Sequence, residues 1–314
     1  MDEAYTIVLE DSDVLSALCG ANDKNLRMFE QYLGVPVVSR GNEMTVLSSD
    51  SNVCEKFQDL ISKASKSPEI KSGSSDDFLN SLVANLQDCG DGLPVEDGRI
   101  VIPRSGKSVY PKNAKQAEFV VKIKKFDLTF GVGPAGTGKT FLATAVALQM
   151  LLNRKVKKIV LTRPVVEAGE NLGFLPGDLT QKITPYLRPL YDIIEYLLPV
   201  NLVRNMEDSG LFEIAPLAYM RGRTLHNSVV ILDEAQNTTK EQMKMFLTRM
   251  GENSKLIVTG DPGQSDIGLS KTSGLEHAVS ILRPISQIGI VEFTSKDVVR
   301  HSLVQKIINA YEKK

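Results

Sequence analysis

The sequence predicts an α/β protein in which a small α+β domain precedes a larger domain built on one parallel sheet. The first observation is a group of short strands and amphipathic helices within residues 1–72. The second is a regular alternation of apolar strands and helices that begins at residue 114. Apolar strands that alternate with helices are typical of a parallel sheet with helices on both faces. We therefore predict domains over residues 1–72 and 101–314, with a linker over residues 73–100.

The smaller domain is predicted from five segments in the order β-α-α-β-β-α. Ser12 or Asp13 is the expected N-cap of its first helix, and Gly20 ends that helix. In the second helix, Leu26, Phe29 and Leu33 have helical spacing. The predicted segments are a strand over residues 5–9, helices over 12–20 and 23–34, a hairpin over 35–49 and a helix over 52–66.

The linker and the larger domain differ in composition. Residues 65–77 are rich in Ser, Lys, Pro and Asp, which favours an exposed linker with a short helix at 78–87. Residues 90–113 are turn-rich and predict an extended arm or a hairpin. In the larger domain we predict strands over 128–133, 157–164, 229–234, 254–261 and 288–294, with helices between them and a long helical insertion before residue 229.

Composition limits the class of protein. The 314 residues are 42% hydrophobic and 24% charged, which is typical of a globular protein. The chain contains no run of about 18 apolar residues and begins without a basic, then apolar, leader, so we predict neither a membrane span nor a secretory signal. Three widely spaced cysteines argue against disulfides or a zinc site. These features predict a cytoplasmic protein.

The net charge of −1 conceals an asymmetry along the chain. Residues 1–98 contain 18 acidic and 7 basic residues, whereas residues 99–314 contain 20 acidic and 30 basic residues. A basic half can attract a polyanion such as nucleic acid. The same charge is also compatible with solvated faces that bind nothing.

The segment GPAGTGKT, residues 133–140, fits the pattern G-x-x-x-x-G-K-[S/T] and lies between a predicted strand and a helix. Glycines let backbone N–H groups turn toward phosphate oxygens, and the helix N-terminus adds partial positive charge. Lys139 is expected to reach the β- and γ-phosphates, and Thr140 to bind Mg²⁺. We call residues 133–140 the phosphate loop.

Two later strands end in polar residues that suit the same ligand. VVILDEAQN, residues 229–237, ends in Asp233, predicted to hold Mg²⁺, and Glu234, predicted to orient and deprotonate the attacking water. TGDPGQSD, residues 259–266, offers the amide of Gln264 to the γ-phosphate or to that water. Both segments fall at the carboxyl ends of strands, where ligands bind in open α/β sheets.

These three motifs, in this order, resemble the PhoH-like ATPase family. The stretches at 161–178, 218–239 and 297–307 are also similar to signatures of that family, and the resemblance covers roughly residues 100–314. It implies a single RecA-like P-loop NTPase core related to superfamily 1 helicases, with ATP and Mg²⁺ as cofactors. Residues 1–72 resemble the KH-like domain of long bacterial members.

The resemblance implies further roles. Gln116, seventeen residues before the phosphate loop, corresponds to the helicase glutamine that reads adenine. Arg163 lies where helicases touch single-stranded nucleic acid, so it could contact nucleic-acid phosphate or ATP. The residues predicted to bind nucleotide are Gln116, Gly133, Pro134, Ala135, Gly136, Thr137, Gly138, Lys139 and Thr140.

A helicase cleaves ATP between two RecA-like domains, and this chain has one. The missing cation therefore has to come from a neighbouring molecule, which implies a homo-oligomer, by family analogy a hexameric ring. The candidate arginine fingers are Arg300, Arg223 and Arg221. Arg300 is the one assigned to catalysis.

The smaller domain is a poor match to an RNA-binding KH domain. The bend that should carry Gly-x-x-Gly reads GAND, residues 20–23, so Asp23 would face phosphate. This favours a domain that supports assembly or binds a protein partner.

Two functions remain open from the sequence. The first is an ATPase that binds, remodels or unwinds single-stranded RNA, for which RNA should raise turnover. The second is a nucleotide-switched adaptor that recruits an RNA-processing nuclease without helicase activity, for which turnover should be slow and independent of RNA.

Overall fold

The computed structural model describes residues 4–67, 70, 75–88, 98–105, 107–165, 179–265, 273–299, 303, 304, 307 and 310. The chain divides into two compact units. The first unit is Met1–Arg99 with Tyr110–Ala117, and the second is Ile100–Val109 with Glu118–Lys314. The boundaries predicted at residues 72 and 101 remain predictions. In the part of the chain that is described, no helix combines the length and the apolar character that crossing a membrane requires.

The first unit has the predicted β-α-α-β-β-α order. Its antiparallel sheet has the strand order β1-β3-β2. Side chains of the sheet and helices form one core, centred on Phe29, Phe57 and Met44, all fully buried. The elements are β1 (Tyr5–Val8), α1 (Ser12–Cys19), α2 (Lys24–Leu33), β2 (Val37–Arg40), β3 (Glu43–Val46) and α3 (Ser51–Ser65).

Two features of this unit differ from the sequence predictions. The N-cap of α1 is Asp11, because its side chain accepts the backbone N–H groups of Asp13 and Val14 from an extended conformation. The short helix predicted within the linker is α5 (Ser75–Asp88), which buries Phe78 and Leu79 in the same core as α2 and α3. It is therefore part of the first unit.

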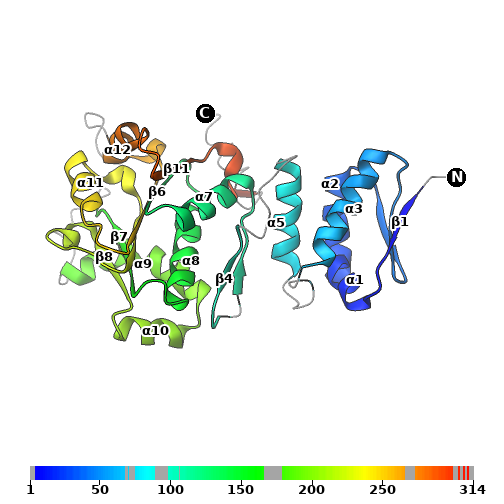
Figure 1. Ribbon diagram of the computed structural model, residues 1–314, viewed down its shortest axis with the longest axis horizontal. Helices are drawn as coiled ribbons and strands as arrows, with labels where there is room; N and C mark the ends of the chain where they lie inside the picture. Colours follow the sequence, from blue (N-terminus) through cyan, green and yellow to red (C-terminus); the bar gives the residue numbers. More distant parts are fainter. Residues whose placement is uncertain are drawn as a thin grey trace. The chain divides into compact units, whose positions relative to one another are not determined.

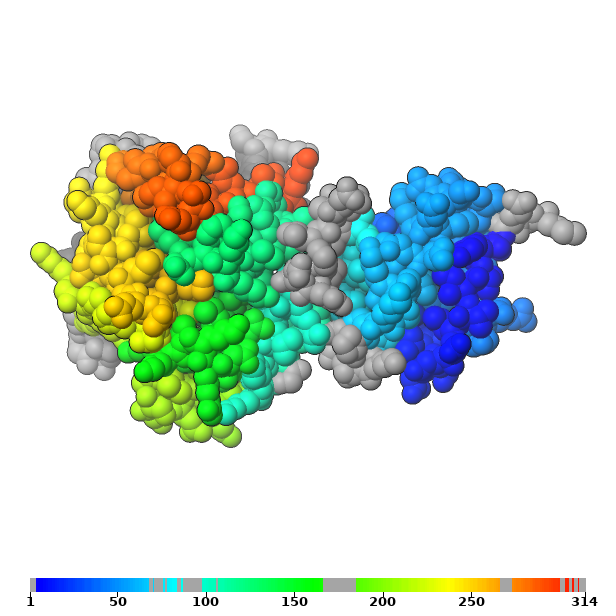
Figure 2. Space-filling model, in the orientation of Figure 1, coloured from blue at the N-terminus to red at the C-terminus, as the bar shows by residue number. Residues whose placement is uncertain are grey.

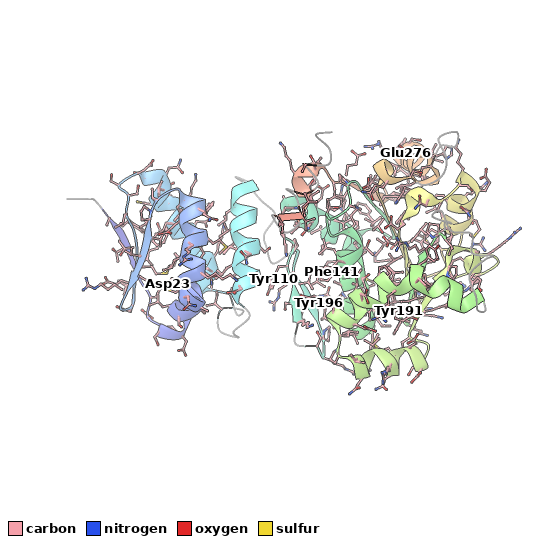
Figure 3. The ribbon with its side chains drawn as sticks, turned by 180° about the vertical axis from the view of Figure 1, so that it is seen from behind. Asp23, Tyr110, Phe141, Tyr191, Tyr196 and Glu276 are labelled. Carbon is pink, nitrogen blue, oxygen red and sulfur yellow. The ribbon has the colours of Figure 1, made fainter. Side chains whose placement is uncertain are left out.

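The bend between α1 and α2 carries the residues that weaken the KH comparison. Asn22 and Asp23 both have left-handed backbone conformations, with φ of 54° and 56°. Asp23 is exposed at the surface of this unit (Figure 3). That this carboxylate would repel a nucleic-acid phosphate stays a prediction.

The second unit contains six parallel strands in the order β11-β6-β10-β9-β7-β8. Figure 1 labels four of them, β6, β7, β8 and β11. The parallel sheet confirms the predicted α/β class with a single RecA-like core. The strand β8 was not predicted, because it lies in the stretch interpreted as helical. It is short, lies at the sheet edge and ends in a proline, as edge strands can. The strands are β6 (Leu128–Val132), β7 (Lys158–Arg163), β8 (Phe212–Pro216), β9 (Ser228–Leu232), β10 (Lys255–Gly260) and β11 (Ile288–Glu292).

Helices cover both faces of this sheet, and β9 shows the alternation that places them. Val229 and Ile231 pack with α8, α9 and α10 on one face, whereas Val230 and Leu232 pack with α11 and α12 on the other. Figure 2 shows α12 in orange against the yellow α11. The helices are α7 (Ala114–Lys125), α8 (Lys139–Leu152), α9 (Leu179–Leu197), α10 (Val200–Asp208), α11 (Lys240–Leu247) and α12 (Gly274–Leu282).

The predicted arm is a hairpin of β4 (Ile100–Ile102) and β5 (Lys107–Val109). Ile100 and Ile102 pack into the core beside α8. Because all six strands of the sheet are parallel, their carboxyl ends lie at one edge, and that edge brings together the motifs found in the sequence.

Candidate nucleotide-binding site

The phosphate loop connects β6 to α8, as predicted. Gly136 and Gly138 have φ of 83° and 79°, a conformation that costs glycine little. Gly133 has φ of 141°, and a Cβ there would lie 2.3 Å from the carbonyl oxygen of Phe293. The loop therefore requires glycine at this position both for its backbone conformation and for its contact with the end of β11.

Lys139 begins α8 and folds back over the phosphate loop. Its Nζ donates hydrogen bonds to the carbonyl oxygens of Gly133 and Pro134, each at 2.7 Å, and to Thr137 Oγ1 at 3.0 Å. The side chain is buried, at 7% exposure. A phosphate oxygen that reached this ammonium would replace one or more of these acceptors, which all belong to the loop itself.

Thr140 and Asp233 meet below the loop. The Thr140 hydroxyl donates to Asp233 Oδ1 at 2.6 Å, and the Thr259 hydroxyl donates to the same oxygen at 2.8 Å. Asp233 is 8% exposed. Hydroxyl and carboxylate oxygens are the ligands that Mg²⁺ prefers, so this donor set fits the ion. Phe141, the next residue of α8, packs on Tyr196 of α9, with ring centroids 5.9 Å apart (Figure 3).

Glu234 has a left-handed backbone, with φ of 53°. Such a conformation is uncommon for a residue other than glycine. Its Oε1 accepts a hydrogen bond from Arg163 at 3.0 Å. Its Oε2 accepts one from the Nε2 of Gln236. The carboxylate is therefore held by two donors from different parts of the sheet edge.

Asp261 joins the phosphate loop to the turn after β10. Its Oδ2 accepts the N–H of Ala135 at 2.8 Å, and its Oδ1 accepts the N–H of Gly263 at 3.0 Å. The short helix Pro262–Gln264 follows, and the side chain of Gln264 is exposed. Gln236 connects both sides, because its Oε1 accepts the N–H of Asp261 at 3.0 Å.

Three residues of this network had no predicted role. Thr259, Asp261 and Gln236 are buried and link the motifs to one another. For Asp261 the sequence did carry a signal, since TGD ends an apolar strand as LDE does. Thr259 bonds Asp233 at the end of the neighbouring strand, and Gln236 bonds Asp261 at the end of β10, so these contacts depend on strand order.

Gln116 belongs to the first unit, whereas the phosphate loop belongs to the second. The Oε1 of Gln116 accepts the N–H of Lys112 at 2.7 Å, among the residues that pack with the first unit. Its role toward adenine stays a prediction. Arg300 lies outside the described residues.

The other two candidate arginine fingers, Arg223 and Arg221, differ in their surroundings. Arg223 donates to both carboxylate oxygens of Glu213, at 2.7 and 2.8 Å, and Lys158 also bonds Glu213 at 2.8 Å. The Arg223 guanidinium is therefore held in a fork by the Glu213 carboxylate at the edge strand β8. Arg221 is exposed.

This ion-pair network predicts a pH-dependent stability. Hydrogen bonds from Arg223, with Lys158, lower the pKa of Glu213 from 4.5 to about 2. A carboxyl whose folded pKa is depressed stabilises the fold above its unfolded pKa and loses that contribution as pH falls toward the folded pKa. We expect Glu213→Gln to lower the unfolding free energy at pH 7 by roughly 1–2 kcal/mol, after allowance for partial exposure.

Urea unfolding measured at several pH values checks this expectation. The difference between wild type and Glu213→Gln should shrink between pH 4.5 and about 2. Glu195→Gln, which breaks a more exposed pair with Arg188, serves as the control and should change little. A difference that stays constant over this pH range would contradict the assignment.

The chain was compared with known protein families and with individual proteins. The profile of the family described as PhoH-like protein matches residues 108–312. The chain belongs to the PhoH-like protein family. A PhoH-like protein of Mycobacterium tuberculosis (strain ATCC 25618 / H37Rv) is 45% identical over 307 residues, covering 95% of this chain and 85% of that protein.

Other PhoH-like relatives span the chain equally well. The PhoH-like protein of Bacillus subtilis (strain 168) is 45% identical over 312 residues, which cover 97% of this chain and 96% of that protein. Among solved structures, the helicase domain of Pyrococcus furiosus Hef matches 57% of this chain and 38% of its own, with 14% identity and a TM-score of 0.36. Membership in the PhoH-like family, together with the phosphate loop, supports a nucleotide-hydrolysing P-loop protein.

Proposed function

We propose that this PhoH-like protein is a cytoplasmic, Mg²⁺-dependent ATPase whose hydrolysis is coupled to binding, remodelling or unwinding of RNA. The observation that carries the proposal is the contact of 2.6 Å between Thr140 and Asp233 below a glycine-rich loop. A hydroxyl and a carboxylate held together at a helix N-terminus suit a metal-bound triphosphate. The two threonine hydroxyls on Asp233 fix its orientation before any ligand arrives.

Each residue of the site has a chemical role in this proposal. The loop amides and Lys139 bind the phosphates, and bound Mg²⁺, held by Thr140 and Asp233, neutralises phosphate charge. Glu234 orients the attacking water and accepts its proton. Gln264 donates or accepts a hydrogen bond at the γ-phosphate or at the water, which its exposed amide can do without a change in charge.

The remaining cation is proposed to come from a neighbouring subunit. Charge on the γ-phosphate in the transition state requires a cation beyond Lys139 and the metal. Arg223 is engaged by Glu213, so Arg221 and Arg300 are the better candidates. We propose an oligomeric ring with ATP at subunit interfaces, in which Gln116 contacts adenine.

We propose that ATP hydrolysis is coupled to RNA because the larger part of the chain has an excess of basic residues. Residues 99–314 carry 30 basic and 20 acidic residues, an excess that suits a polyanion. We expect single-stranded RNA to raise steady-state ATP turnover, and the stimulation to weaken as salt rises. The assay compares ATP hydrolysis with and without RNA at several salt concentrations.

The same assay distinguishes the alternatives. Slow turnover that RNA leaves unchanged would contradict the RNA-coupled ATPase and favour a nucleotide-switched adaptor for an RNA-processing nuclease. Undiminished turnover per molecule at high dilution, in a protein that sediments as a monomer with ATP and Mg²⁺, would exclude an arginine supplied by a neighbour.

A further inference from the structure

We propose that Arg163 is a positioning residue that fixes the carboxylate of Glu234 in the orientation needed to activate water. This inference rests on the proposed ATPase function and adds a role that differs from the two suggested by its place in the sequence. Arg163 would then act on the reaction through Glu234, without contact to nucleotide or to nucleic acid.

Strand order places the two residues together. Arg163 is the last residue of β7, and β7 pairs with β9 so that Thr162 lies opposite Leu232. The two parallel strands end at the same level, and the N–H of Asp233 donates to the carbonyl oxygen of Thr162 at 2.9 Å. Arg163 and Glu234 follow these paired positions, so the contact is built into the sheet register.

The guanidinium is anchored at two points. Its NH2 group donates to Glu234 Oε1 at 3.0 Å, and its NH1 group donates to the carbonyl oxygen of Tyr186, on α9, at 3.4 Å. The Arg163 side chain is 23% exposed. Because α9 holds one end of the planar group, its other end presents a fixed donor to the carboxylate.

The second oxygen of Glu234 is fixed independently. Gln236 is 1% exposed, and its Oε1 accepts the N–H of Asp261, which sets the orientation of the amide. Its Nε2 therefore faces Glu234 Oε2. With one donor on each oxygen, the carboxylate cannot rotate freely, yet each oxygen keeps a further acceptor position for water.

The left-handed backbone of Glu234 supports a functional role for its contact with Arg163. A left-handed conformation at a glutamate carries strain that persists when surrounding contacts fix it, and such residues cluster at active sites. A partly exposed ion pair contributes little to overall stability. Its removal should therefore change the chemical step much more than the fold.

The test compares Arg163→Ala and Arg163→Lys with wild type in steady-state ATP hydrolysis, without RNA. We expect Arg163→Ala to lower kcat by about 10- to 100-fold, because misplacing a catalytic group has effects of that size. KM for ATP and binding of a non-hydrolysable ATP analogue should change little. Arg163→Lys should recover part of the loss, since it restores the charge without the planar fork.

A double variant tests whether Arg163 acts on kcat through Glu234. Adding Arg163→Ala to Glu234→Gln should cause no further loss, because residues that act through one another are not additive. Arg188→Ala, which breaks two ion pairs on the exposed face of α9, is the matched control and should keep kcat within about twofold. Thermal unfolding of each variant checks that it is folded, and Arg163→Lys carries the test if the alanine variant is not.

Several outcomes would overturn the inference. A raised KM with unchanged kcat would place Arg163 on the nucleotide, and unchanged basal turnover with lost RNA stimulation would place it on nucleic acid. If the losses of kcat were additive in the double variant, Arg163 would not act through Glu234. An inactive wild type would overturn the proposed function together with this inference, whereas an active wild type with a fully active Arg163→Ala would overturn the inference alone.

Discussion

Replacing Lys139 with alanine is expected to lower kcat for ATP hydrolysis by at least about 100-fold, because one donor aimed at transition-state charge is worth that much. Lys139 begins α8 and is the one lysine within the phosphate loop. Steady-state hydrolysis measures the loss. The variant should remain folded, since the hydrogen bonds described for the Lys139 ammonium go to oxygens of the phosphate loop.

A matched lysine gives the control for this experiment. Lys244 lies exposed on α11, so Lys244→Ala should hydrolyse ATP as wild type does. Circular dichroism and thermal unfolding compare the two variants. Normal hydrolysis by a folded Lys139→Ala would contradict the assignment of the phosphate loop.

Glu234→Gln is expected to lower kcat by about 10²- to 10⁴-fold while ATP binding is kept. The amide has the same size as the carboxylate, so it can occupy the same space, but it cannot accept a proton from water at neutral pH. Because Glu234 bonds Arg163 and Gln236 rather than the phosphate loop, the binding of a non-hydrolysable analogue should change little.

Turnover and equilibrium binding, measured on the same preparation, separate these two effects. Glu252→Gln, in an exposed turn, is the control and should behave as wild type. If Glu234→Gln turned over ATP at the wild-type rate, another group would have to activate the water. If it lost nucleotide binding as well, Glu234 would have a role in the fold of the site.

The parts of the site that the sequence predicted are those with a local signal. The phosphate loop follows from glycines and a lysine at fixed spacing between a strand and a helix. That Asp233 would lie beside it follows from the rule that parallel strands end at one edge. Thr140 and Asp233 do lie in contact, although their roles toward a ligand remain predictions.

The sequence did not predict contacts that depend on partners far away in the chain. Thr259 bonds Asp233 because β10 lies beside β9, and no local sequence pattern predicts this strand order. The pairing of Arg163 with Glu234 depends in the same way on β7 and β9. Periodicity indicates where strands begin and end, whereas strand order comes from packing of the whole sheet.

The fold was predicted well where periodicity was strong and less well in short or weakly patterned segments. The strand β8 has five residues and follows two helices, so it was interpreted as helical. The helix α5 lies among Ser- and Asp-rich residues, which led to its assignment to a linker, but the buried Phe78 and Leu79 tie it to the first unit. In both segments tertiary packing overrode the local pattern.

The proposed function requires the phosphate loop and Asp233 to hold one metal-bound triphosphate. A crystal structure with a non-hydrolysable ATP analogue and Mg²⁺ would show this arrangement. We expect phosphates against the backbone amides of residues 133–140, with Mg²⁺ bound by the Thr140 hydroxyl and Asp233 next to it. Density for the analogue elsewhere, or Mg²⁺ held without either of these two residues, would contradict it.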